Sequence, residues 1–171
     1  LLETIPSIHA GGGLERVLPR VVEGVVDLTR AGRQVIIVTS GAISLGMDRL
    51  DFPERPQLLP DKQACAAVGQ IRLMSVYQEA FDRYGIAAAQ ILLTEDDFTA
   101  RARYLSLRNT FQRLLQLGVV PIVNENDTVS TSEIETSMGR PGEPDHVPVF
   151  GDNDALSAIV AAKLDSDVLV L

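Results

Sequence analysis

The chain has very little of the residue types that form disulfides and metal sites. Its 171 residues include one cysteine, two histidines and no tryptophan. The single cysteine, Cys65, excludes an internal disulfide and fits a reducing, cytoplasmic location. His9 and His146 stand alone, without the paired spacing of a zinc site, so no metal site is expected.

Cationic residues and long apolar runs are also scarce. The formal net charge is −8, and Lys62 and Lys163 are the only lysines. Because nucleic-acid affinity depends on clustered lysine and arginine, no nucleic acid is expected to bind through this chain. No apolar run reaches the roughly 20 residues that a membrane helix needs, and the first residues lack the pattern of a signal peptide. With 46% apolar residues, the chain is predicted to form one domain over residues 1–171.

Apolar runs alternate with helical patterns along the chain. Runs without polar alternation predict buried strands at 34–42 (including a terminal turn), 86–93, 119–123 and 166–171. Apolar residues at helical spacing predict helices over 14–30, 62–84, 100–117 and 154–163, with Ile71 and Leu105 on buried faces. Residues 1–13 and 51–61 are read as loops. This alternation predicts an α/β fold, a three-layer αβα sandwich with a mainly parallel sheet.

Two polar clusters lie at the ends of these elements. Residues 124–127, Asn-Glu-Asn-Asp, follow a buried strand directly, and residues 151–154, Gly-Asp-Asn-Asp, precede a helix. In open α/β sheets, ligands bind beyond the carboxyl ends of the strands, so these side chains are the first candidates for function. Asn153 or Asp154 could instead be an ordinary helix cap. The long connection over 128–150 between the clusters could be a lid.

A turn of small residues, Ser40-Gly41-Ala42, follows the strand that begins at residue 34. Small residues let backbone amides approach a ligand closely, and a strand-to-helix turn can present amides and a hydroxyl group to a carboxylate. The alternative is a tight turn in which Ser40 caps the next helix.

Four stretches together resemble one family, the glutamate 5-kinases of the amino acid kinase superfamily. They are residues 38–43 (VTSGAI), 62–70 (KQ and AAVGQ), 123–127 (VNEND) and 151–158 (GDND and LSA). The resemblance implies ATP-dependent phosphorylation of the γ-carboxylate of L-glutamate, the first step of proline biosynthesis. It also implies Mg²⁺ carried with ATP, proline as a feedback inhibitor in the glutamate pocket, and a homo-oligomer assembled through helices like the one near Gly69.

The resemblance assigns roles to particular residues. Those expected to hold glutamate are Ser40, Gly41, Ala42, Asn124, Asp127 and Asn153. Asp154 matches the acidic residue that organises the phosphate-binding lysines. The chemistry agrees, because Asp127 can accept hydrogen bonds from an ammonium group, while the amides around Ser40 and the Asn153 side chain can donate to a carboxylate.

The sequence also departs from the family pattern. Family members begin with a strand ending in a Lys-x-Gly-Ser/Thr turn, and later segments hold the nucleotide; neither is present in this sequence. Residues 1–171 are therefore expected to be the acceptor-substrate part of a kinase domain, with an incomplete sheet, no assigned nucleotide-binding residues and no activity in isolation. The alternatives are a superfamily member acting on carbamate, aspartate or a nucleoside monophosphate, the kinase half of a bifunctional pyrroline-carboxylate synthase, and a non-catalytic sensor of glutamate or proline.

Overall fold

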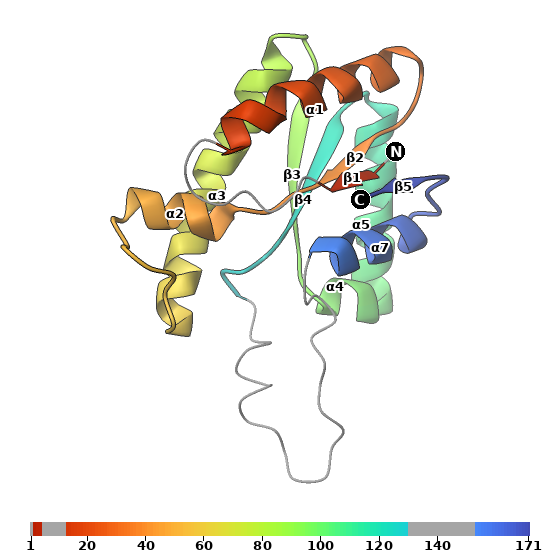
Figure 1. Ribbon diagram of the computed structural model, residues 1–171. Helices are drawn as coiled ribbons and strands as arrows, with labels where there is room; N and C mark the ends of the chain where they lie inside the picture. The colour runs from red at the N-terminus through yellow and green to blue at the C-terminus, as the bar shows by residue number, and fades with distance from the viewer. Residues whose placement is uncertain (1, 5–12, 130–152) are drawn as a thin grey trace.

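A parallel five-stranded sheet forms the middle layer of the computed structural model, which describes residues 2–4, 13–129 and 153–171 (Figure 1). The strands are β1 (Leu2–Thr4), β2 (Ile36–Val38), β3 (Ala88–Leu93), β4 (Val120–Glu125) and β5 (Leu169–Val170). Their order across the sheet is β3-β4-β2-β1-β5, and every pairing is parallel. The predicted α/β class with a mainly parallel sheet is therefore confirmed.

Helices cover both faces of this sheet. On one face lie α1 (Gly13–Arg30), α2 (Ala42–Arg49) and α3 (Leu59–Asp82), and on the other lie α4 (Asp96–Thr99), α5 (Arg101–Gln116) and α7 (Asn153–Lys163) (Figure 1). Alternate strand residues serve the two layers, since Ile37 packs with α1 and α3 whereas Ile36 and Val38 pack with α5 and α7. The core is thus two apolar layers separated by the sheet.

Strand β4 is an interior strand of the sheet although it contains a proline. Pro121 lacks the N–H group that a central strand normally uses. The amides of Val120 and Asn126 point toward β3, where they donate to the carbonyl groups of Ala87 and Leu93. By alternation, the nitrogen of Pro121 faces β2, and pairing with β2 begins only at the next residue, Ile122. The missing N–H group therefore lies where β4 is not paired with β2, and the pairing with β3 is unaffected.

Helices α2 and α3 approach each other unusually closely. A Cβ atom added at Gly69 of α3 would lie 1.7 Å from the carbonyl oxygen of Ala42, and one added at Gly46 of α2 would lie 1.8 Å from that of Cys65. Only glycine fits at these two positions. The contact holds the start of α2 rigidly against α3.

Some predicted details of the fold are wrong. Residues 1–13 were expected to be a loop, but Leu2–Thr4 form β1 in the interior of the sheet, and α1 begins at Gly13. The last strand was expected to be buried, but it is short and lies at the edge, with Val170 36% exposed.

Two side chains expected in the core are also exposed. Ile71 is 73% exposed and Leu105 is 47% exposed. On α3 the close approach of α2 selects a face that includes the small residues Ala66 and Gly69, and this turns Ile71 outward. An apolar periodicity alone could not locate that face.

Among the described residues, no helix has both the length and the apolar composition required to cross a membrane. His9, His146 and residues 130–150 of the predicted lid lie outside the described residues.

Candidate functional site

The predicted Ser40–Ala42 turn joins the carboxyl end of β2 to α2. Gly41 is the N-cap residue of α2 and has a φ of 100°, a left-handed conformation that glycine adopts without strain. Ser40 precedes this residue, so the alternative that Ser40 caps the helix is wrong. The first intrahelical hydrogen bond runs from the Leu45 amide to the Gly41 carbonyl, which leaves the preceding amides of α2 without an intrahelical acceptor. A carboxylate can bind to such amides.

The Asn124–Asp127 cluster lies at the carboxyl end of β4. Asn124 and Glu125 are the last residues of the strand, and Asp127 lies in the turn that follows. The Asn124 side chain is buried, and its Nδ2 donates a hydrogen bond of 2.9 Å to Oε1 of Gln70. Asp127 is half-buried. A buried amide and a half-buried carboxylate therefore lie three residues apart in sequence at this edge.

The two segments are neighbours in the sheet. Strands β2 and β4 pair in register, Val38 with Val123, and the Thr39 amide donates to the Val123 carbonyl at 2.8 Å. Strand β2 ends at this contact and β4 continues to Glu125, so Ser40 and Asn124 each lie one residue beyond the bonded pair, at the same edge of the sheet. This is the edge at which open α/β sheets bind ligands.

The third predicted segment comes from the opposite layer. Asn153 and Asp154 lie in the first described turn of α7, and the Asn153 carbonyl accepts a hydrogen bond of 2.6 Å from Oγ of Ser157. Asn153 is half-buried and Asp154 is exposed. Figure 1 shows the start of α7 toward the same end of the sheet as the carboxyl ends of β3 and β4. Convergence of these side chains with Ser40 and Asp127 on one pocket stays a prediction.

Four polar residues that were not predicted as functional support these segments, three of them buried and the fourth, Gln90, exposed. The Tyr77 hydroxyl donates to Oγ1 of Thr39 at 2.9 Å, and Gln70 accepts from Asn124 and donates to Oε1 of Gln90 at 3.1 Å. Burial raises the pKa of Tyr77 above its ordinary range, so this hydroxyl remains a donor. The sequence contains an indication of this supporting role, since Gln70 is a polar residue inside the apolar pattern of its helix.

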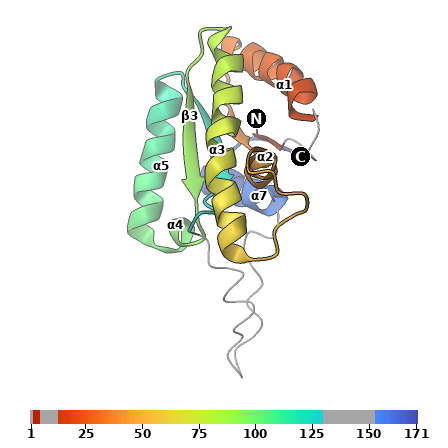
Figure 2. The ribbon, with the colours of Figure 1, turned by 90° about the vertical axis from the view of Figure 1, so that its left-hand side faces the viewer.

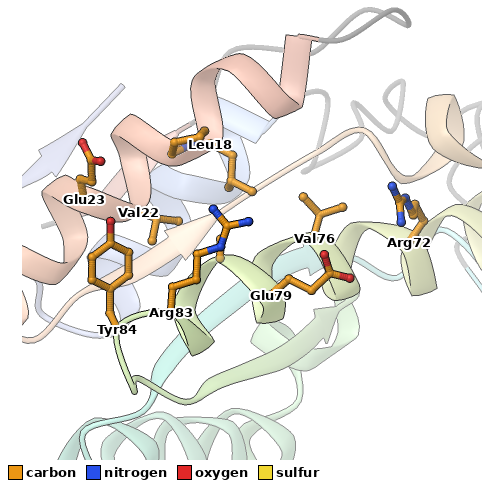
Figure 3. Close-up of a pocket in the computed structure, with 10 residues that line it drawn as sticks. Leu18, Val22, Glu23, Arg72, Val76, Glu79, Arg83 and Tyr84 are labelled. Carbon is orange, nitrogen blue, oxygen red and sulfur yellow. The ribbon is translucent and has the colours of Figure 1, made fainter.

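A cavity of about 360 Å³ lies elsewhere, between α1 and the second half of α3 (Figure 3). Leu18, Val22 and Val76 contribute apolar side chains, and Figure 3 shows Arg83 reaching from α3 toward α1 beside Tyr84. None of the predicted site residues lines this cavity.

Metal-ligating side chains are dispersed in the described part of the chain. Within residues 2–4, 13–129 and 153–171, no three His, Cys, Asp or Glu residues are grouped so that they could hold a metal ion.

Comparisons with known proteins agree with the motifs. The glutamate 5-kinase of Moorella thermoacetica is 51% identical over 154 residues, which is 90% of this chain and 37% of that protein. The Myxococcus xanthus enzyme is 51% identical over 82% of this chain and 33% of its own length, and the Methanococcoides burtonii enzyme is 48% identical over 88% and 37%. The chain therefore spans little more than a third of the curated relatives it matches, and the predicted resemblance to glutamate 5-kinases is confirmed. The model of the amino acid kinase family matches residues 7–171, nearly the whole sequence, and the chain belongs to that family.

Proposed function

We propose that the protein containing this chain phosphorylates the γ-carboxylate of L-glutamate with ATP, the first step of proline biosynthesis, and that residues 1–171 bind the acceptor substrate. The observation that carries the proposal is the in-register pairing of β2 and β4, whose ends carry the Ser40–Ala42 turn and the Asn124–Asp127 cluster. The identity of about half of the aligned residues to glutamate 5-kinases supports the same substrate.

The two segments suit the two charged groups of an amino acid. The free amides at the start of α2 and the carboxamide of Asn153 are donors for the α-carboxylate. Asp127 is an acceptor for the α-ammonium group, and charge-assisted hydrogen bonds of this kind are among the strongest in proteins. A zwitterion held at both ends would present its γ-carboxylate in a fixed direction, and phosphoryl transfer depends mainly on such positioning.

ATP and Mg²⁺ belong to the same proposal. Mg²⁺ prefers oxygen ligands and is commonly held by substrate phosphates, which fits an ion delivered with ATP rather than by a cage of protein side chains. Asp154, an exposed carboxylate in the first turn of α7, is suited to accept hydrogen bonds from cationic side chains around the phosphates.

The experiment measures ADP release by the full-length protein with glutamate, aspartate, carbamate and UMP as acceptors, and traps acyl phosphate with hydroxylamine. Glutamate alone should give both ADP and a hydroxamate. Preference for another acceptor would overturn the glutamate assignment. Glutamate binding without ADP release would favour a sensor, the second class of function considered from the sequence.

Asp127→Asn in the full-length protein tests the ammonium contact. The KM for glutamate should rise about tenfold or more, because each factor of ten corresponds to about 1.4 kcal/mol and a lost charge pair exceeds that. Asp96→Asn is the matched control, since Asp96 follows β3 at the same edge and its side chain is 79% exposed. An unchanged KM in Asp127→Asn would contradict the role of Asp127.

Proline inhibition, homo-oligomerisation and a cytoplasmic location complete the proposal. Proline shares the α-carboxylate and a cationic nitrogen with glutamate, so it should compete for the same donors and acceptor. The free, buried Cys65 fits a reducing compartment. Competition kinetics and light scattering of the full-length protein test the first two.

A further inference from the structure

Three carboxamide side chains form a continuous hydrogen-bonded chain from the edge of the sheet to the candidate site. Nδ2 of Asn124 on β4 donates to Oε1 of Gln70 on α3 at 2.9 Å, and Nε2 of Gln70 donates to Oε1 of Gln90 on β3 at 3.1 Å. Figure 2 shows α3 running along β3, which places the helix where it can bridge the two strands. We call these three residues the carboxamide chain.

The register of the sheet explains why the carboxamide chain can form. Gln90 pairs with Ile122, and Ile122 packs in the apolar layer of α1 and α3, so Gln90 faces that layer. Asn124, two residues after Ile122, faces the same way. Both strand residues therefore point toward α3, and Gln70 stands between them.

Burial makes the two inner carboxamides, Asn124 and Gln70, costly unless both are hydrogen-bonded, whereas Gln90 is exposed on β3. Asn124 is 3% exposed and Gln70 is 8% exposed. A buried carboxamide without a partner loses its hydration and gains nothing in return. Replacing these residues with apolar ones would remove that cost, so stability alone does not account for two carboxamides here.

The direction of the hydrogen bonds determines what Asn124 presents to a ligand. A carboxamide has a donor end and an acceptor end. In the structure Gln70 uses its donor end on Gln90, its acceptor end faces Asn124, and Asn124 turns its NH₂ group inward. The Oδ1 atom of Asn124 is then directed away from Gln70 as an acceptor.

We propose that Gln70 is a positioning residue for the acceptor substrate. It fixes the carboxamide of Asn124 so that Oδ1, rather than the NH₂ group, meets the α-ammonium group, and Gln90 fixes Gln70 in turn. This inference rests on the proposed function, since it assigns how the same site recognises an amino acid. A site with Oδ1 fixed in this way selects substrates that carry an ammonium group over dicarboxylates that lack one.

The test compares two ligands, L-glutamate and glutarate, which lacks the ammonium group. Calorimetry on the full-length protein measures both dissociation constants in wild type and in Gln70→Leu. We expect Gln70→Leu to raise the dissociation constant of glutamate about tenfold, as for a lost hydrogen bond to a charged group. The dissociation constant of glutarate should stay nearly unchanged. An equal loss for both ligands, or no loss for either, would overturn the proposal, because a purely structural role affects both ligands alike.

Two further variants make the comparison specific. In Gln70→Glu, either form of the new side chain still accepts a hydrogen bond from Nδ2 of Asn124, so the preference for glutamate should survive. Gln78→Leu, a change on the exposed part of the same helix where Gln78 bonds only Asp82 in the described contacts, should alter neither constant. If Gln70→Glu loses as much preference as Gln70→Leu, the orientation argument is wrong.

A second measurement judges the inference independently of the proposed function. In ¹⁵N-labelled protein, the side-chain amide protons of Asn124 should exchange slowly with solvent, and Gln70→Leu should make them exchange faster. Should Gln70→Leu fail to fold, Gln90→Leu removes the outer bond and should give a smaller acceleration. Equal protection in wild type and variant would refute the positioning role, whereas a wild type that binds no glutamate would refute the proposed function alone.

Discussion

The hydroxyl group of Tyr77 donates a hydrogen bond to Oγ1 of Thr39, at 2.9 Å, in the apolar layer between α3 and the sheet. Thr39 directly follows β2 and directly precedes Ser40. Helix α3 therefore holds the end of β2 through Tyr77 and the end of β4 through Gln70. One helix supports both segments of the candidate site.

Replacing Tyr77 with phenylalanine should destabilise the fold by about 1 kcal/mol, the typical net contribution of a hydrogen bond. Urea unfolding gives the free energy of unfolding. Tyr104→Phe is the matched control, because the Tyr104 hydroxyl donates to the Lys163 carbonyl at 2.8 Å near the surface. Water can replace that bond, so the control should lose less; equal losses would contradict the buried contact.

Stability should fall at alkaline pH through the same tyrosine. Burial raises the pKa of Tyr77 in the folded chain above its ordinary value of about 10, while the unfolded chain keeps that value. Above about pH 10, the unfolded chain releases a proton that the folded chain retains, so the free energy of unfolding decreases as pH rises. Below about pH 10 the contribution is fully present. Urea unfolding at several pH values across this range should show that the free energy of unfolding depends less on pH in Tyr77→Phe than in wild type.

The glycine contact between α2 and α3 predicts opposite effects for two alanine substitutions. Gly69→Ala places a Cβ atom 1.7 Å from the Ala42 carbonyl oxygen and should destabilise by about 1–3 kcal/mol or more, since the backbone must move. Gly24→Ala in α1 meets nothing within 4 Å and should stabilise by about 0.5–1 kcal/mol, as expected within a helix. Thermal unfolding compares the stability of the two variants. A loss of stability in both would show that the lack of space around Gly69 does not cause the destabilisation.

Much of this architecture follows from the sequence, because the period of apolar residues reports local structure. The uninterrupted run around Ile122 predicted a doubly buried strand, and β4 is one. The turn at Gly41 was predicted from residue size, and its left-handed φ gives the physical reason.

What could not be predicted depends on contacts between distant segments. The three residues of β1 carry too weak a local signal, and the strand exists because β2 and β5 pair with it on either side. The pairing of Gln70 with Asn124 spans 54 residues and depends on how far α3 lies from the sheet. Ile71 was assigned to the core because periodicity indicates that a helix has a buried face, without identifying the neighbour that selects it.

Substitutions at Asp165 separate the effect of backbone conformation on stability from the effect of charge. Its φ is 54°, and its carboxylate pairs with Arg108 at 2.7 Å on the surface. Exposed ion pairs contribute little, whereas a left-handed residue favours Asn or Gly over Ala. Asp165→Asn should therefore leave the melting temperature almost unchanged, while Asp165→Ala should lower it. Equal losses in the two variants would assign the effect to the ion pair.

The thiol of Cys65 should react slowly in the folded protein. Burial, with a smaller contribution from the Asp61 carboxylate, raises the pKa of Cys65, and the thiolate is the reactive form. Labelling with an aromatic disulfide reagent should be slow under native conditions and rapid in denaturant. Rapid labelling of the native protein would show that the close contact of Cys65 with α2 opens frequently.

The position of β1 has a consequence for biosynthesis. Leu2 pairs on one side with Ile36 and on the other with Leu169, so β1 is translated long before its second neighbour, β5. While the ribosome is translating the intervening residues, one backbone edge of this nascent strand has no partner, and unpaired edges recruit other chains. Folding of this chain should therefore be slow, and most vulnerable to aggregation just before β5 emerges.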